Sequence, residues 1–357
     1  MKDTVVIMLI FAMLLFATPV AHSAFVNTGA ENVDKPVQTE QPPHRVTSPD
    51  KVTLALSGGS DRERIIVMSV EEYLTGCLFA QISLDYHEQA LKAQAIAAHT
   101  YLLKLISDRQ NEQGRFTSAV NQVEQEQNSI VGSVSELLTA PLITDNPETC
   151  QPYFTTEAAE AHYGSELYNE YLPKVRAAAK YGASRVITYD GEPIYAVYHS
   201  ISAGVTNTAQ GVWGYELPYL QSVDSSWDRT HPNYLCTNEF TADSIRTALY
   251  KFNANATLPV DATKWFVNPL KNEFGYVQSV RVGDCLLSGG DSRRIFGFRS
   301  VAFDVSYRAG DIFVVESRGF GHGVGLSQYG ANILAGRGFS CEEILLHYYS
   351  GVEIIKV

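Results

Sequence analysis

The chain has 357 residues, 45% of them hydrophobic, and carries a formal net charge of −12 at pH 7. That apolar content is enough for a large folded core. The excess of acidic residues argues against a nucleic-acid partner, because phosphate binding needs a basic surface.

The N-terminus has the features of an export signal. Lys2 precedes an uncharged apolar run over residues 5–17, and the small residues before Ala24 resemble a signal-peptidase site. The run is slightly short for an ideal membrane span. We expect residues 1–25 to be either a cleaved signal peptide or, as the weak positive charge favours, an uncleaved signal anchor in the membrane. Both alternatives place the rest of the protein in an extracytoplasmic compartment.

Residues 26–50 are polar, contain several prolines and show no periodicity, so we expect a flexible linker. A globular domain is expected over residues 51–357. Its first signal is the capping-box pattern from Ser69 to Glu72, which predicts a helix to about residue 79.

The segment from Asp85 to Glu88 repeats the capping pattern and predicts a longer helix over residues 88–106. Lys92 and His99 lie seven residues apart and therefore share one face of that helix. Residues 107–150 are polar and irregular, and we expect an insert of variable structure there.

The following residues mix helices and strands. A helix is expected over residues 166–183 with a break near Pro173, and Asp190-Gly191 marks the turn of a β-hairpin. Further signals predict a helix over residues 241–252, short strands within 274–316, and a last helix that ends at Gly351. The elements do not alternate as regular βαβ units, so an α+β domain is expected.

The five cysteines are an odd number, so one at least is unpaired within a monomer. Cys77 lies in an apolar run and is expected to be buried as a small residue. Cys236 and Cys285 could form a disulfide, and the sequence leaves this open.

The segment RGFGHGVGLSQYGAN, residues 318–332, is unusually rich in glycine. Its spacing fits neither a dinucleotide loop nor a P-loop. The run from Gly325 to Gly330 is one residue too long for the nucleophile elbow of a hydrolase, although a serine hydrolase that uses Ser327 remains an alternative. His87-Glu88 does not begin a zinc-protease motif, because position 91 is leucine.

The glycine-rich segment resembles the signature of stage II sporulation protein D and its relatives, the amidase-enhancer proteins of bacterial cell-wall metabolism. Further stretches are similar in order and span about residues 50–355: VEEYLTGCLFAQIS (70–83), HEQALKAQAIAAHTYLL (87–103), YDGEPIYAVYHSISAG (189–204) and GVWGYELPYLQSVDSSWD (211–228). The resemblance implies a sporulation-associated lytic transglycosylase that cuts peptide-stripped peptidoglycan glycan strands to 1,6-anhydro-muramic ends during engulfment.

In that family the catalytic acid is a glutamate, and its position here holds Gln81. Glutamine has no titrating proton, so it cannot serve as acid and then base. Ser83 replaces a usual proline and His99 a usual arginine. The sequence therefore predicts weak or absent transglycosylase activity. Asp85 and Glu88 could replace the acid, but we expect them to serve the N-terminus of the long helix.

The remaining site residues are expected to bind glycan in a cleft, with the glycines letting backbone and sugar approach. They are Lys92, His99, His199, Ser200, Ser202, Gly321, His322, Gly323, Gln328 and Tyr329. The alternative for the glycines is a tight turn packed against the core.

Some relatives are reported to hold zinc before the central helix, and only Cys150 matches here, so no zinc or other cofactor is expected. The expected partners are glycan strands, a membrane through the N-terminal segment, and a cell-wall amidase or endopeptidase. The alternative function is a non-catalytic glycan-binding scaffold that recruits or stimulates an amidase.

Overall fold

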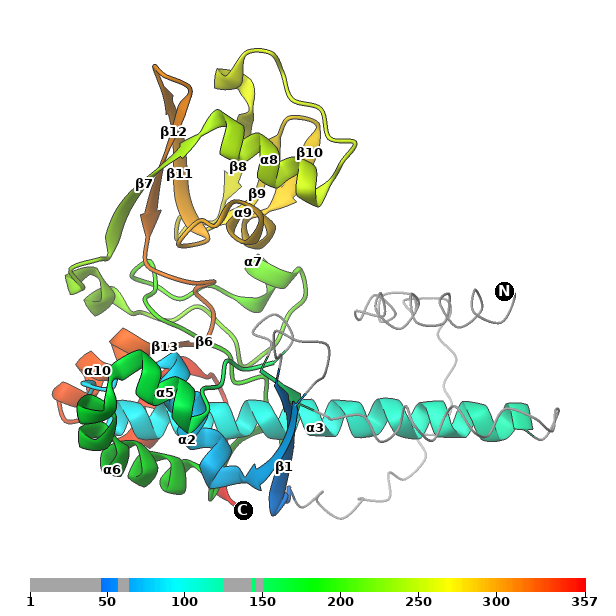
Figure 1. Cartoon of the computed structure of the whole chain (residues 1–357), viewed down its shortest axis with the longest axis vertical. Coiled ribbons are helices and arrows are strands. Elements are labelled where there is room, and N and C mark those ends of the chain that lie inside the picture. Colours follow the sequence, from blue (N-terminus) through cyan, green and yellow to red (C-terminus); the bar gives the residue numbers. More distant parts are fainter. Residues whose placement is uncertain (1–45, 57–63, 125–142, 146–149) are drawn as a thin grey trace, which may run out of the picture. The chain divides into compact units, whose positions relative to one another are not determined.

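The computed structural model describes residues 46–56, 64–124, 143–145 and 150–357. One long helix, α3 (Glu88–Glu124), contacts four others: α2 (Val70–Gln81), α6 (Ser165–Gly182), α10 (Gln328–Gly336) and α11 (Cys341–Tyr348) (Figure 1). Small residues make these contacts close. An added Cβ at Gly182 would lie 2.6 Å from the Cβ of Ala95.

Two apolar cores meet on α3. Leu91, Ala95 and Ala98 pack in the first core with α2, α6 and β1 (Lys51–Leu56), whereas Ala90, Ala93 and Ala97 pack in the second core with α10, α11 and β4 (Arg185–Tyr189). Because α3 is buried on both sides, it fixes where the ends of α2 and α10 lie. Those two ends carry Gln81 and Gln328.

The helices differ from the predictions in three places. Helix α3 begins at Glu88 as expected, but Asp85 does not cap it: the Asp85 carboxylate accepts from Ser83 Oγ at 2.6 Å, and His87 Nδ1 accepts from the backbone N–H of Gln89 at 3.2 Å. The helix continues to Glu124, so the prediction of an irregular segment is wrong for residues 107–124. Helix α6 runs through Pro173 without ending.

The capping box of α2 is confirmed, with Ser69 and Glu72 bonding each other's backbone N–H groups. The hairpin is confirmed too: β4 pairs with β5 (Glu192–Pro193) across Asp190 and Gly191, which both have positive φ. Its second strand is only two residues long. The chain then leaves that sheet, and β6 (Tyr198–His199) pairs in parallel with β13 (Leu326–Ser327).

The remaining strands form small sheets. The order β2-β1-β3 joins Arg64–Ser69, β1 and Ile143–Thr144, and β14 (Glu353–Lys356) pairs with β4. A third core lies between two sheets and two helices (Figure 1). Its elements are β7 (Leu235–Thr241), α8 (Ala242–Phe252), β8 (Phe266–Lys271), β9 (Val277–Val282), β10 (Cys285–Ser288), α9 (Gly289–Phe296), β11 (Ala302–Arg308) and β12 (Ile312–Arg318).

Shorter helices complete the described chain: α5 (Thr156–Tyr163), α7 (Ala209–Trp213), η1 (Ser226–Thr230) and η2 (Ala262–Lys264). The mixture of helices and strands confirms the α+β class, and the described residues form one compact unit. All five cysteines are free, so Cys236 and Cys285 are not bridged, and Cys77 is buried. No helix in the described ranges is long and apolar enough to cross a membrane. The expected leader (1–25) lies outside those ranges.

Candidate functional site

The parallel pairing of β6 with β13 brings two sequence motifs together. Tyr198 lies opposite Leu326 and His199 opposite Ser327, and the Phe320 N–H donates to the carbonyl of Ile201 at 2.7 Å. The glycine-rich segment is therefore packed along residues 197–204.

The glycines of this segment are needed for that packing. An added Cβ at Gly319 would lie 2.5 Å from the carbonyl oxygen of Ile201, and one at Gly325 would lie within 3.0 Å of the carbonyl oxygen of Val197. Both residues also have positive φ, a region that L side chains rarely adopt. Close contact within the protein thus accounts for these glycines, and Gly321 is the member of the set that also lines a pocket.

Replacing Gly325 with alanine is expected to destabilise the fold more than the same change at Gly214. The φ angles of Gly325 and Gly214 are +71° and +81°. Backbone strain should therefore lower the free energy of unfolding of each alanine variant by about 1–2 kcal/mol. Gly214 has no neighbour within 4 Å, whereas Gly325 faces Val197. Overpacking should cost the Gly325 variant about 1–3 kcal/mol more. Urea unfolding of the two variants tests this, and equal losses would contradict the packing argument.

A pocket of about 400 Å³ lies beside the glycine-rich segment. Six of the predicted site residues line it: Gln81, His199, Ser200, Gly321, His322 and Gln328. Sequence reasoning missed several others: Tyr101, Gln151, Tyr198, Arg293 and Phe320. These come from α3, the loop before α5, β6, α9 and the segment after β12, so only the tertiary fold brings them together.

Five predicted residues lie outside the lining of this pocket, two of them on α3. Lys92 forms an ion pair with Glu88 at 3.2 Å. His99 is fully buried, and its Nδ1 contacts the carbonyl oxygens of Gly182 and Arg185 at 3.1 and 2.9 Å. Burial lowers the pKa of His99. His99 therefore joins α3 to the start of β4.

The other three surround the glycine-rich segment. Ser202 is buried and its Oγ accepts from the N–H of Gly204 at 3.0 Å. Gly323 packs against the ring of Tyr276. The hydroxyl of Tyr329 contacts Thr230 Oγ1 at 3.1 Å. These contacts are internal to the protein.

The side-chain amide of Gln81 is held by partners on both of its ends. Its Nε2 donates to the carbonyl of Pro152 at 2.6 Å, and its Oε1 accepts from the hydroxyl of Tyr198. Gln328 Nε2 donates to the Gln81 backbone carbonyl at 2.9 Å, and Gln151 Oε1 lies 2.8 Å from the Tyr198 hydroxyl oxygen as a second acceptor for its single proton. A chain of neutral hydrogen-bonding groups thus forms the floor of the pocket.

Two histidines, the buried His199 and the partly buried His322, line the pocket with ring centroids 5.7 Å apart. Burial, and then the charge of Arg293, lowers the pKa of His322 to about 4. Burial and the neighbouring His322 lower the pKa of His199 to about 3. Both rings are therefore neutral near pH 7. His199 Nδ1 lies 3.1 Å from the carbonyl oxygen of Val324 and must donate to it, so Nε2 is an acceptor.

None of the described residues that line the pocket is an aspartate or glutamate. Asp85 and Glu88, the two residues that could replace the catalytic acid, have partners outside the pocket. Asp85 contacts Ser83, and Glu88 contacts Lys92. Among all the residues that the structure describes, no group of three or more His, Cys, Asp or Glu side chains is placed to hold a metal ion.

Asp228 is a further residue that sequence reasoning did not single out. It is buried and accepts hydrogen bonds from the N–H of Ser202 and from Ser327 Oγ, both at 2.7 Å. Burial raises its pKa to about 6. Its position at the end of the stretch GVWGYELPYLQSVDSSWD was the available signal. Asp228 thus connects its own stretch (211–228) to the stretch that contains Ser202 (189–204) and to the glycine-rich segment that contains Ser327.

Ser327 does not have the setting of a hydrolase nucleophile. Its side chain is fully buried, its Oγ donates to Asp228, and the same Oγ accepts from the N–H of Gly330 as the N-cap of α10. A catalytic serine needs an adjacent base and access to substrate. The structure thus favours a capping role.

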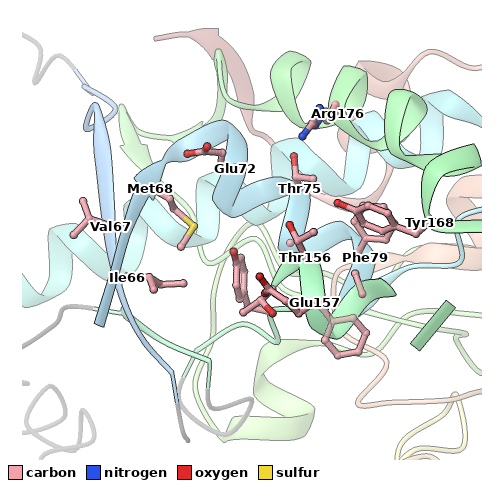
Figure 2. A pocket seen from close by; sticks show the side chains of 15 residues that line it. Ile66, Val67, Met68, Glu72, Thr75, Phe79, Thr156, Glu157, Tyr168 and Arg176 are labelled. Atoms are coloured by element: carbon pink, nitrogen blue, oxygen red, sulfur yellow. The ribbon is translucent and has the colours of Figure 1, made fainter. Parts of the chain in front are cut away.

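A second pocket, of about 310 Å³, lies between β2, α2, α5 and α6. Figure 2 shows Ile66 and Met68 of β2 near Glu72 and Thr75 of α2, with Tyr168 and Arg176 of α6 on the other side. None of the predicted site residues lines it. The pocket beside Gln81 is therefore the candidate functional site.

The chain thus has a mixed α+β fold in which the glycine-rich segment lines a pocket of polar side chains, with Arg293 as the charged one among them. A family model described as "Stage II sporulation protein" matches residues 59–189. The chain is 30% identical to "Stage II sporulation protein D" of Bacillus amyloliquefaciens over 285 residues, which are 80% of this chain and 74% of that protein. The protein of the same name from Bacillus subtilis (strain 168) is 30% identical over 286 residues, with the same coverage.

A more distant relative is the "Amidase enhancer" of Bacillus subtilis (strain 168), 26% identical over 243 residues. The match covers 54% of this chain and 34% of that protein. The chain belongs to the stage II sporulation protein D family. The resemblance inferred from the motifs is thereby confirmed.

Proposed function

We propose that the protein binds glycan strands of peptidoglycan in the pocket beside Gln81, during sporulation and outside the cytoplasm, without cutting them. One observation carries the proposal: the pocket is lined by the amide of Gln81, which the resemblance places at the catalytic-acid position, and by no described carboxylate. The N-terminal segment would hold the protein at the membrane.

The proposed loss of cleavage follows from the acidities in the pocket. A lytic transglycosylase needs one group that protonates the departing glycosidic oxygen and then removes a proton from the muramic 6-hydroxyl. The pKa values of His199 and His322 are lowered to about 3 and about 4, so neither ring is in the imidazolium form that could act as a general acid near pH 7. Burial raises the pKa of Tyr198 well above its usual value, so its hydroxyl remains protonated. None of these groups can alternate between acid and base near neutral pH.

The same groups suit the binding of sugars. The side chains of Gln151 and Gln328 and the hydroxyl of Ser200 can exchange hydrogen bonds with hydroxyl and acetamido groups, while Tyr101 and Phe320 offer apolar surface. Binding of a glycan without its cleavage therefore requires only the polar and aromatic side chains that line the pocket.

The full-length protein should retain soluble peptide-stripped glycan strands in a binding assay and leave them intact. Mass spectrometry of the strands after incubation should find no new 1,6-anhydro-muramic ends. New anhydro ends would show that another acid acts, and a lack of binding would refute the proposed function itself.

A second candidate is that the bound protein recruits or stimulates a cell-wall amidase. It is supported by the relative named as an amidase enhancer. Release of stem peptides from whole walls by an amidase should then rise when the protein is added. If the release of stem peptides does not rise and the amidase does not co-purify with the protein, this candidate function is refuted and the proposed glycan binding is unaffected.

A further inference from the structure

Strand β2 is an edge strand, and part of its backbone has no partner among the described residues. In the order β2-β1-β3, β2 pairs with β1 alone. The Asp145 N–H donates to the Ala55 carbonyl at 3.2 Å, so the backbone groups of Ala55 point toward β3 and away from Ile65, its partner in β2. Because such pairs alternate along an antiparallel ladder, Ile65 and Val67 both direct their N–H and C=O groups to the open edge.

The open edge of β2 lacks the common features that prevent strand pairing. Its sequence, RIIVMS, has no proline, and its register with β1 is continuous without a bulge. The side chains of Ile65 and Val67 are 55% and 59% exposed. Only the end of the edge is closed, where the Ser69 N–H donates to Glu72 at 2.8 Å. The rest of the edge is a pairing position for another strand.

The pocket of about 310 Å³ runs along this edge. Ile66, Val67 and Met68 all line it, although successive side chains of a strand point to opposite faces. In Figure 2 the side chains of Ile66 and Met68 point toward the pocket and that of Val67 points away. The pocket therefore borders the edge of β2 as well as one face. Further aromatic lining comes from α2, the loop before α5, and α6: Phe79, Tyr153, Phe154 and Tyr168.

The pocket also contains a cation without a direct partner. Among the described residues, Arg176 of α6 has neither a hydrogen bond nor an ion pair. Glu72, in contrast, accepts from the N–H and the hydroxyl of Ser69 at 2.8 and 2.9 Å. A guanidinium pairs most strongly with a carboxylate, through two parallel N–H···O bonds. An occupant of this pocket should therefore present a carboxylate to Arg176.

We propose that this edge groove, formed by β2, Phe79, Tyr153, Tyr168 and Arg176, binds an extended segment of a partner protein. The segment adds to β2 as a strand, places an apolar side chain in the pocket and pairs a carboxylate with Arg176. A second copy of β2 does not meet these requirements, because RIIVMS contains no carboxylate. The proposal does not depend on glycan binding, since no residue lines both this groove and the pocket beside Gln81.

The first test lets the protein select its own ligand. A phage library of random linear peptides is enriched on the full-length protein. The enriched peptides should share apolar residues at alternate positions and an aspartate or glutamate at a fixed distance from them. A selection that yields no common motif, or a motif without an acidic residue, would refute the proposal.

The second test measures the affinity of the synthetic consensus peptide by fluorescence anisotropy. Arg176→Gln should weaken its binding about tenfold, and should not alter the binding of a peptide whose acidic residue is replaced by its amide. Lys180→Gln removes the same charge from an exposed position one turn along α6, outside the groove, and should bind as the wild-type protein does.

A second pair of variants examines the backbone of β2. Val67→Pro removes an N–H that points to the open edge, where proline is tolerated, and its ring occupies the place of the added strand. Binding of the peptide should weaken about tenfold or more. Val67→Thr keeps the N–H and should retain the wild-type affinity.

The outcomes distinguish the possible occupants. Equal losses in Arg176→Gln and Lys180→Gln would refute the role of Arg176, because net charge would then be the cause. Unchanged binding by Val67→Pro would refute strand addition. A wild-type dimer in analytical ultracentrifugation that Val67→Pro dissociates would show that a second copy fills the edge, against the proposal. The peptide selection on the wild-type protein decides the matter even where a variant does not fold, and retention of glycan strands tests the proposed function separately.

Discussion

Replacing Gln81 with glutamate is expected to create the glycan-cutting activity that the wild-type protein is proposed to lack. A general acid of this kind contributes about 10²–10⁴-fold to a rate. In the variant, one carboxyl oxygen would take the place of Nε2, which lies 2.6 Å from the Pro152 carbonyl oxygen. Only a protonated oxygen can hydrogen-bond to that carbonyl. The introduced carboxyl should therefore keep its proton to higher pH than an ordinary glutamate, as a general acid requires.

The measurement is the rate at which 1,6-anhydro-muramic ends form on peptide-stripped strands, followed by mass spectrometry for the wild-type protein, Gln81→Glu and Gln81→Met. The methionine variant has a similar length and no acidic proton, so it should remain inactive. A glutamate variant that binds strands but makes no product would show that more than the proton donor has been lost. Product from the methionine variant would show that position 81 is not the acid position.

The contribution of Asp228 to the stability of the wild-type protein should fall between about pH 4 and pH 6. Burial raises the pKa of this carboxyl from 3.8 to about 6. Between those values the folded state holds a proton that the unfolded state has released, so stability present below pH 3.8 is lost as the pH rises through 6. The free energy of unfolding should decrease by about 3 kcal/mol from this one group.

Asp228→Asn isolates that contribution, because an amide does not titrate. The difference in unfolding free energy between the wild-type protein and this variant, measured by urea unfolding from pH 4 to 7, should shift by about 3 kcal/mol in favour of the variant. Asp224→Asn, an exposed carboxyl in the same segment, is the matched control. A difference that stays constant with pH would show that Asp228 does not titrate in this window.

Local signals in the sequence predicted local structure well. The Ser69–Glu72 capping box and the Asp190-Gly191 turn each depend on a few adjacent residues, and both are present. The end of α3 was missed because residues 107–124 lack an apolar face, and that face was the only evidence used. Pro173 does not end α6, although it removes one backbone donor.

The site was predictable where a resemblance could place it and unpredictable where tertiary packing decides. Gln81, His199 and His322 lie in recognisable motifs, and all three line the pocket. His99 and Lys92 share a helical face, but periodicity does not reveal that the start of β4 covers His99. Arg293 has no motif around it. It reaches the pocket only because the third core places α9 beside the glycine-rich segment.

The pairing of β6 with β13 makes the pocket a late product of synthesis. Gln81 and Tyr101 belong to the first third of the sequence, whereas His322 and Gln328 belong to its last third and are synthesised much later. Contacts between such distant residues also form slowly. A chain that lacks the segment around His322 and Gln328 therefore lacks this pocket, so the binding proposed for it requires that segment to be synthesised and folded.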